Sequence, residues 1–365
     1  MSEDLKVIGI TKKNLRDSIE KNIYWKEDLA PMPKSKAHWL VSNNRIQEDD
    51  YCGVIAFEGK KMVSFVYMIP DLINTHDNIS KKAYWMIDWW VIEKYKDTVL
   101  GTYVYNEAIK LAGKQVLIKG YTENLQEFYD KQPFTLIASR YRHTIFFSLD
   151  SSMLIGKFKF LKSIKFAIDM FDSLISKVIR LINKYKLGKR TVNIKYDFVN
   201  QLDNDTWNFI EPLCKNDLIF KTRDYIDWQI NNNQYLQTPI SIKTPYKNLQ
   251  TGISNNIHIH NLKIILDNKI IGFVSYIINY NEFNVKYFLV EDEINYNLCV
   301  DALIENFIKS KRNFIFTDDT KLSNNINKRY FSIFNHKVLK KGLVHNDTKF
   351  DYDNLKMLNR DGHFY

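Results

Sequence analysis

Asp88 is the one acidic residue inside an apolar stretch, Tyr84 to Val91, whose aromatic and β-branched residues predict a buried strand. Burial penalises a carboxylate and raises its pKa, so Asp88 is suited to accept a proton from an ammonium group. An aspartate at this position can equally be held by hydrogen bonds to neighbouring groups, without a part in chemistry. His38 and His143 are alternative bases, and water can serve for an amine of low pKa.

A basic loop follows this strand and leads into a predicted helix, Val99 to Ala112. Lys94 and Lys96 lie in the loop and are candidates to contact phosphate as point charges. Free N–H groups at a helix N-terminus favour phosphate as well. The alternative is that both lysines are ordinary solvated side chains.

The elements around these residues predict a βαβα unit. A second strand, Val116 to Lys119, and a second helix, Glu123 to Lys131, complete it, and the parallel strands place the basic loop at the helix N-terminus. Ahead of it we expect a strand at 5–10, a helix at Lys12 to Tyr24, a loop-rich segment at Ala30 to Arg45, and antiparallel strands at Tyr51 to Phe57 and Lys61 to Ile69.

Two motifs in this unit resemble the GNAT acyltransferase superfamily, which moves an acyl group from coenzyme A to an amine. The loop from Val91 to Gly101 is similar to the family's Val-x-Pro-x-x-Arg-Gly-x-Gly-x-Gly, although Asp97 and Val99 replace two glycines. Val99 adds a side chain where backbone should approach pyrophosphate closely. The segment Tyr129-Asp-Lys-Gln-Pro-Phe is similar to Tyr-Glu-Lys-x-Gly-Phe.

The resemblance implies roles for individual residues. Backbone N–H groups from Trp89 to Val91 would face the thioester carbonyl, and Tyr129 would be the general acid near the sulfur. Asn124 lies off the family's register, so a helix cap is an alternative role for it. The implied acyl-coenzyme A contacts are Trp90, Val91, Lys96, Val99, Leu100, Gly101, Thr102 and Asn124.

A second resemblance concerns the acceptor. Arg223-Asp-Tyr-Ile-Asp-Trp is similar to a pattern in GNAT-like proteins of bacterial polysaccharide gene clusters, including sugar N-acyltransferases that act on nucleotide-linked amino sugars. Gln229 replaces the final arginine of that pattern, and the Arg-Asp pair lies two residues closer to the tyrosine. The implied acceptor contacts are Arg45, Asp71, Arg223, Asp224, Tyr225 and Trp228. Trp89 is a further candidate from the aromatic cluster of Trp85, Trp89 and Trp90, most of which should be core, with one ring free to stack on a sugar or base.

Composition limits the class of protein. A net charge of +10 favours polyanionic partners, whether nucleic acid, an anionic membrane or phosphate-bearing small molecules. Coenzyme A and a nucleotide-linked sugar would each satisfy it, and with these as the hypothesis no nucleic acid is expected. The three cysteines are widely spaced, which argues against a disulfide scaffold and fits a reducing cytoplasm. The N-terminus has no long apolar core, so we expect no secretion signal. His258 and His260 lack a third ligand, so no metal is expected.

The remaining chain predicts a long helix and a second domain. Apolar residues recur at helical spacing from Met153 to Tyr185, with lysines between them. We interpret this segment as a connecting helix packed between domains or against a second subunit; a basic helix lying on a membrane surface is the alternative. Charges interrupt it too often for a transmembrane span.

Beyond this helix the first half's plan repeats, without the basic phosphate loop. The predicted strands lie near Tyr196 and at Ser241 to Lys243, Ile257 to Asp267, Lys269 to Ile278, Asn284 to Val290 and Asn313 to Thr317. The predicted helices are Thr206 to Leu213, Phe220 to Asn231, Tyr296 to Ser310 and Leu322 to Phe331.

We therefore expect an α/β protein of two GNAT-like domains, 1–150 binding acyl-coenzyme A and 191–365 binding the acceptor, joined by an amphipathic linker helix over 151–190. The hypothesis is a cytoplasmic N-acyltransferase that acylates a dTDP- or UDP-linked amino sugar for surface polysaccharide synthesis, with a homodimer as one candidate assembly. The alternatives are an aminoacyl-tRNA-dependent transferase acting on a peptidoglycan precursor, and a non-catalytic binding protein.

Overall fold

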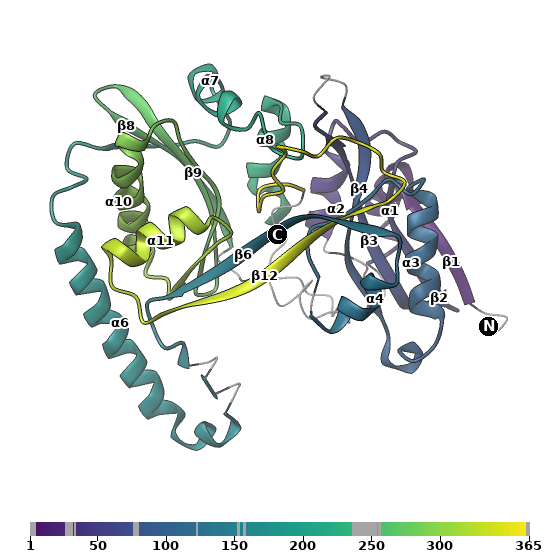
Figure 1. Ribbon diagram of the computed structural model, residues 1–365. Coiled ribbons are helices and arrows are strands. Elements are labelled where there is room, and N and C mark those ends of the chain that lie inside the picture. Colours follow the sequence, from purple (N-terminus) through teal and green to yellow (C-terminus); the bar gives the residue numbers. More distant parts are fainter. Residues whose placement is uncertain are drawn as a thin grey trace. The chain divides into compact units, whose positions relative to one another are not determined.

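The computed structural model describes residues 5–25, 32, 34–75, 80–121, 123–151, 154–155, 158–235, 254 and 257–362. The protein has an α/β fold, and its chain divides into two compact units (Figure 1). The first unit comprises Met1–Ser139, Cys214–Ile257 and Lys340–Tyr365, and the second comprises Arg140–Leu213 and His258–Leu339. The chain therefore passes between the units four times.

The first unit contains a sheet with the strand order β1-β2-β3-β4-β5-β12. Neighbouring strands are antiparallel except β4 and β5, which are parallel. The strands are β1 (Leu5–Thr11), β2 (Tyr51–Glu58), β3 (Lys61–Ile73), β4 (Lys81–Val91), β5 (Val116–Ile118) and the end of β12 (Phe334–His345).

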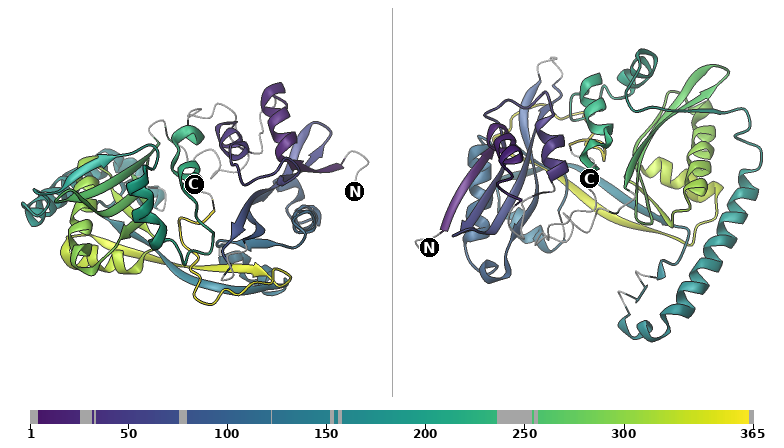
Figure 2. Two further views of the ribbon diagram at one scale, coloured as in Figure 1. Left: turned by 90° about the horizontal axis from the view of Figure 1, so that it is seen from above. Right: turned by 180° about the vertical axis from the view of Figure 1, so that it is seen from behind.

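Helices cover both faces of this sheet (Figures 1 and 2). On one face lie α1 (Lys12–Lys21), α2 (Lys34–Val41) and α8 (Arg223–Ile230), which is followed by η4 (Asn232–Tyr235). On the other lie α3 (Leu100–Leu111) and α4 (Gln126–Asp130), preceded by the single 3₁₀ turns η1 (Glu93–Tyr95) and η2 (Glu123–Leu125). A hydrophobic core fills the space between the sheet and each helical layer.

The second unit contains a sheet with the strand order β6-β11-β10-β9-β8-β7. Its strands are β6 (Phe134–Phe146), β7 (Lys195–Phe198), β8 (His258–Leu266), β9 (Lys269–Asn279), β10 (Glu282–Val290) and β11 (Phe314–Thr317). Its helices are η3 (Lys159–Ile164), α6 (Lys165–Leu187), α7 (Asn204–Leu213), α10 (Glu293–Ser310) and α11 (Thr320–Arg329). α10 packs on the sheet and also contacts α6.

Both units repeat one plan, as the sequence predicted. Antiparallel strands lead to a parallel pair joined by a crossover helix: β4-α3-β5 in the first unit and β10-α10-β11 in the second. The strand beside each parallel pair comes from the other half of the chain. Leu343 and Val344 of β12 pair with β5, whereas residues 143–146 of β6 pair with β11.

This exchange of strands makes the expected domain boundaries wrong. The first unit does not end near Asp150, residues 151–190 belong to the second unit and are not a linker, and α8 belongs to the first unit. A strand has the same alternation of apolar and polar residues whichever sheet it joins, so the sequence alone does not reveal the exchange.

The helix α2 was also missed, because the prolines at 31 and 33 indicated a loop. Its residues Ala37, Trp39 and Leu40 are buried and contribute to the core. The long helix predicted from Met153 begins later, because the 3₁₀ segment η3 starts at Lys159 and α6 at Lys165. The remaining predicted helices and strands are present within a few residues of their expected bounds, except that Ser241 to Lys243 lies outside the described residues.

Candidate active site

The strands β4 and β5 separate soon after they meet. They pair only at Tyr84 with Val116 and at Trp85 with Leu117, yet β4 continues to Val91 while its other edge stays paired with β3. Within the described part of the chain, no strand pairs with the β5-facing edge of β4 beyond Trp85. Backbone N–H groups along this edge are therefore free of a sheet ladder. We call the edge from Met86 to Val91, together with the end of β5, the fork.

A β-bulge at Asp88 reshapes the fork. In the ladder with β3, Phe65 pairs with Trp90 and Tyr67 pairs with Ile87, so β4 contains one extra residue over this interval. Asp88 has φ of +51°, a left-handed conformation that aspartate tolerates better than most residues. A bulge of this kind reverses the alternation of the strand and changes the direction of its side chains.

The side chain of Asp88 lies close to a buried lysine. Burial raises the pKa of Asp88, and attraction to the Lys36 ammonium opposes that rise. Burial likewise lowers the pKa of Lys36, and Asp88 opposes that shift. Tyr67 is a neighbour of Lys36, whose Nζ lies 6.0 Å from the centroid of the Tyr67 ring. Burial is the largest cause of the raised pKa of Tyr67, followed by charge on Cys52 and on Asp88. Its buried hydroxyl has no hydrogen-bond partner among the described residues.

The N-terminus of α3 lies directly after β4 and the η1 turn. Val99 occupies the cap position, makes no side-chain capping bond and is 71% exposed. Thr98 Oγ1 accepts a 3.3 Å bond from the Leu100 N–H, while the N–H groups of Gly101 and Thr102 have no partner in the described chain. The uncapped turn can receive an anion through its N–H groups and the helix dipole.

The remaining predicted cofactor contacts divide between surface and core. Lys96 is exposed and 3.4 Å from Glu93, and Lys94 forms a 2.6 Å ion pair with Glu58. Leu100 is buried in the core, so it can offer a ligand its backbone only. Asn124 is exposed on η2.

Tyr129 lies on α4 within a cluster of aromatic rings. It is 7% exposed and packs against Tyr121, Tyr105 and Phe134, with ring centroids 4.5, 6.3 and 5.9 Å away. Burial raises the pKa of Tyr129 to about 12. Its hydroxyl therefore stays protonated throughout the physiological pH range.

Three of the predicted acceptor contacts meet in one buried cluster. Asp71 Oδ1 is 3.3 Å from Arg45 Nη1, and Asp71 Oδ2 accepts a 2.7 Å bond from the Tyr225 hydroxyl. The Arg45 guanidinium stacks 3.7 Å from the centroid of the Tyr225 ring. The Leu72 N–H donates to Asp71 Oδ1 at 2.9 Å, and the Trp85 indole donates to Asp71 Oδ2 at 3.1 Å, so each carboxylate oxygen has two donors. Because a carboxylate accepts about four hydrogen bonds, Asp71 is fully occupied by the protein.

The same side of the unit holds a stacked pair of tryptophans. Trp39 of α2 and Trp228 of α8 lie with ring centroids 4.0 Å apart, and each indole donates to the other residue's carbonyl, at 2.9 and 2.7 Å. Trp228 is thus a structural contact between two helices. Arg223 and Asp224, at the start of α8, are partly and fully exposed.

Trp89 lies on the face opposite to these acceptor candidates. Its indole donates a 3.1 Å bond to the Gly101 carbonyl, and its ring packs against Tyr105 and Phe128. It therefore fixes the start of α3, and the bulge explains why its side chain faces α3. Trp90 faces the other core and stacks on Phe65 at 5.7 Å.

Sequence reasoning missed Lys36 and Tyr67. Lys36 lies on the unpredicted helix α2, and a single lysine in a lysine-rich chain carries no signal. Of the alternative bases, His38 is exposed on α2. His143 belongs to the second unit, where its ring contacts Thr320 Oγ1 at 3.1 Å and Asn335 Nδ2 at 3.4 Å.

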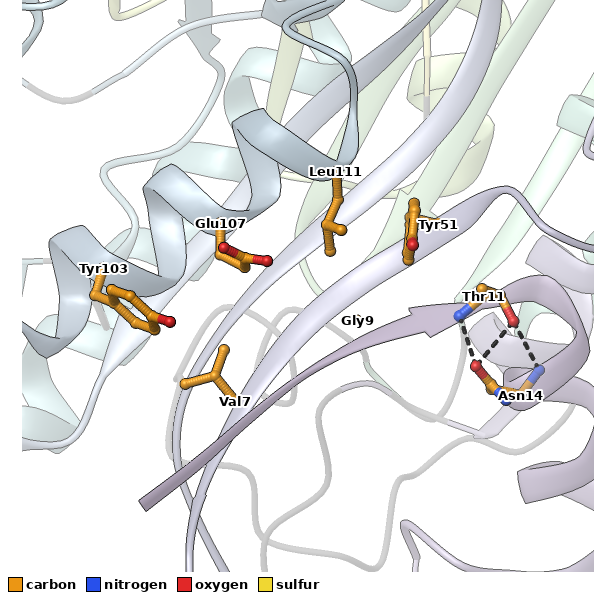
Figure 3. A pocket seen from close by; sticks show the side chains of 8 residues that line it. All are labelled: Val7, Gly9, Thr11, Asn14, Tyr51, Tyr103, Glu107 and Leu111. Carbon is orange, nitrogen blue, oxygen red and sulfur yellow. Dashed lines mark hydrogen bonds between the residues drawn. The ribbon is translucent and has the colours of Figure 1, made fainter. Parts of the chain in front are cut away.

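A cavity of about 290 Å³ lies elsewhere in the first unit, between β1, β2 and α3 (Figure 3). Tyr51, Tyr103 and Glu107 are among its lining residues, none of which comes from β4 or β5. Thr11 and Asn14 at its margin hydrogen bond to each other as the capping box of α1. The cavity is therefore separate from the fork.

The second unit has a parallel pair of strands but a different helix start. Asp292 caps α10, and its Oδ1 accepts a 2.7 Å bond from the Asn295 N–H. A carboxylate occupies the position where the first unit leaves N–H groups free, so this helix end repels an anion. Among the described residues, no group of three His, Cys, Asp or Glu side chains is arranged to hold a metal ion, and no helix is both long and apolar enough to cross a membrane.

Comparison with known proteins yields only distant likenesses. No family model matches the sequence, and no curated protein matches it. The chain is similar to a solved Enterococcus faecalis V583 protein of unknown function described as a probable N-acyltransferase, with 10% identity, TM-score 0.49 and coverage of 94% of this chain and 73% of that one.

Two further solved structures are GCN5-related N-acetyltransferases. The Kribbella flavida protein has 10% identity, TM-score 0.45, and coverage of 94% and 73%. The Anabaena variabilis protein has 7% identity, TM-score 0.46, and coverage of 93% and 72%.

Proposed function

We propose that this protein is an N-acyltransferase of the GNAT type, which moves an acyl group from acyl-coenzyme A to the amino group of a nucleotide-linked amino sugar. The observation that carries the proposal is the fork, whose free backbone edge leads directly into the uncapped N-terminus of α3. A thioester in the fork and a pyrophosphate at the helix would match the two ends of one coenzyme A molecule.

The chain's own residues supply the steps of a direct transfer. The amine forms a C–N bond to the thioester carbon, and free N–H groups of β4 stabilise the oxyanion. The raised pKa of Asp88 makes it a stronger base than an ordinary aspartate, so it takes the proton that the amine loses. The C–S bond then breaks and releases the thiolate of coenzyme A.

For Tyr129 we propose hydrogen bonding to the leaving sulfur. Its pKa of about 12 lies well above the value of about 8.5 for an ordinary thiol, so full proton transfer to the thiolate is unfavourable. A hydrogen bond from the neutral hydroxyl to the sulfur stabilises developing charge without that transfer.

A nucleotide-linked amino sugar fits the charge of the chain and the motif at the start of α8. The net charge of +10 attracts a diphosphate, and Arg223 and Asp224 are accessible to polar groups of such an acceptor. Because Arg45, Asp71 and Tyr225 bond to one another, we propose that they position α8 and do not bind the acceptor directly. The three cysteines are unpaired and buried, which is compatible with the cytoplasm as the site of action.

The test is thiol release from a panel of acyl-coenzyme A donors, each combined with dTDP- and UDP-linked amino sugars. We expect turnover with at least one pair, and its loss in Asp88→Asn. Asp49→Asn is the matched control, because Asp49 is exposed and the substitution is the same. Absence of turnover with every pair would contradict the proposal, and transfer that requires aminoacyl-tRNA would replace it with the peptidoglycan-precursor reaction.

A further inference from the structure

The amphipathic helix α6 exposes its apolar face and buries its polar face. Its buried face is mainly polar and consists of Asp172, Ser176, Ile179, Asn183 and Leu187. Its opposite face is apolar and exposed; Leu181 is 66% exposed and Tyr185 is 86% exposed. We call this surface the α6 stripe; it comprises Ile164, Met170, Phe171, Leu174, Val178, Leu181, Ile182 and Tyr185.

Hydrogen bonds fix this orientation. The Asp172 carboxylate accepts bonds from the Leu149 and Ser151 N–H groups, at 2.7 and 3.0 Å. The Asn183 side chain both donates to the Phe331 carbonyl and accepts from its N–H, each at 2.8 Å. The helix therefore cannot rotate to bury its apolar face without leaving these buried polar groups unpaired.

The helix α10 of the same unit does not share this exposed apolar face. α10 is eighteen residues long and buries its apolar side chains, including Val300, Leu303 and Phe307, in the core. The α6 helix, of twenty-three residues, exposes its apolar side chains along most of its length. An exposed apolar surface of this extent marks an interaction site.

Lysines flank the stripe. At 100° per residue, Lys177 and Lys184 follow one margin of the stripe, and Lys186 follows the other. Residues 159–190 contain nine basic and two acidic residues, a net charge of +7. Of the two acids, Asp172 is buried and Asp169 is paired with Lys165. The long lysine side chains can extend past apolar surface and keep their ammonium groups in a polar layer.

We propose that the α6 stripe lies on the surface of a lipid bilayer with anionic headgroups. An apolar face bordered by lysines fits the boundary between acyl chains and headgroups, where the apolar side chains enter the membrane and the lysines meet lipid phosphates. A second copy of the chain is the competing occupant. Self-pairing of the stripes would bring the flanking lysines of two copies together, and like charges beside a helix interface oppose association.

The test is flotation of the full chain with vesicles of phosphatidylcholine alone and of phosphatidylcholine mixed with phosphatidylglycerol. We expect binding to the anionic vesicles only, weakened by added salt because the lysine attraction is screened. The triple variant Phe171→Ser, Leu174→Ser, Leu181→Ser should reduce the partition coefficient by about a hundredfold or more, since each side chain contributes apolar burial.

Charge is tested separately from apolar area. The triple variant Lys177→Glu, Lys184→Glu, Lys186→Glu should lose binding by about a hundredfold or more. The control triple Lys13→Glu, Lys60→Glu, Lys328→Glu changes net charge equally at exposed lysines outside α6 and should retain most of the binding.

Three results would overturn the proposal. The first is equal binding of the α6 triple variants and the wild type, and the second is no flotation with either vesicle. The third is a stable dimer in light scattering that the Phe171→Ser, Leu174→Ser, Leu181→Ser variant converts to a monomer, because the stripe would then be covered by a second copy. Circular dichroism of the variants confirms that the helix remains folded.

Discussion

Replacing Asp88 with asparagine removes the proposed base while keeping the bulge. Asparagine adopts the left-handed conformation that Asp88 has at φ +51° and has nearly the same shape. A positioned general base contributes about 10² to 10⁴ in rate. We therefore expect kcat/KM of Asp88→Asn near neutral pH to fall by about a hundredfold or more, with coenzyme A affinity unchanged.

The pH dependence of the wild type gives the prediction a second readout. A protonated carboxyl group cannot accept the amine proton, so activity should rise with pH through the pKa of Asp88, which burial places above the ordinary value of about 3.9. Replacing Lys36 with methionine removes the charge that opposes this rise. The acid limb should then move to higher pH.

The assay is the initial rate of thiol release between about pH 5 and 9, with fixed saturating acceptor. Thermal unfolding of each variant establishes that the fold is intact. If Asp88→Asn retains wild-type kcat/KM and the same acid limb, or if Lys36→Met leaves the limb in place, the reasoning about Asp88 as base is wrong.

Three further substitutions test other parts of the site. Tyr129→Phe should lower kcat about tenfold while KM for acyl-coenzyme A stays constant, and an unchanged kcat would exclude the hydrogen bond to sulfur. Wild-type rates should show no decline attributable to ionisation of Tyr129 below its pKa of about 12. Asp71→Asn should lower the free energy of unfolding in urea by about 3–5 kcal/mol, because Arg45 loses its buried partner. The control Asp224→Asn, at an exposed position, should lower it by less than about 0.5 kcal/mol. Equal losses for the two variants would refute the buried cluster as a source of stability. Trp228→Phe should cost about 0.5–1.5 kcal/mol, because the Trp39 carbonyl loses the indole bond and keeps only its bond from the Ser42 hydroxyl. A smaller change in the same unfolding assay would count against the tryptophan pair.

The order of elements could be predicted from the sequence because local periodicity determines it. The aromatic strand β4, the helix α3 and the short strand β5 all lie where the pattern placed them. The second half repeats this order, and its acidic helix start proved to be a cap by Asp292. These features depend on residues within one turn or one strand of each other.

Long-range arrangement could not be predicted in the same way. The exchange of β6 and β12 leaves no local trace, and neither does the placement of α8 in the first unit. Two adjacent tryptophans after Asp88 break the alternation of β4, and this was the available signal of the bulge. Without the bulge, Trp89 was predicted to face an acceptor, although it packs under α3.

Three residues that the resemblance predicted as acceptor contacts lie together in the structure, but they bond to one another, so we assign them a positioning role instead. Arg45, Asp71 and Tyr225 form one cluster although Tyr225 is distant in sequence. The donors that occupy Asp71 come from several elements, so its full hydrogen bonding could be seen only after folding. Lys36 became a candidate only because α2 places it near Asp88.

The most direct test of the proposed cofactor site is calorimetric titration of coenzyme A into the wild type, Val99→Asp and Val99→Asn. Val99 is exposed at the start of α3, so both substitutions are tolerated by the fold and differ only in charge. Aspartate reproduces the anionic cap of α10 and should weaken coenzyme A binding by about tenfold or more, whereas asparagine should stay within about twofold of wild type. Equal affinity for the aspartate and asparagine variants, or no binding by the wild type, would contradict a coenzyme A site at this helix.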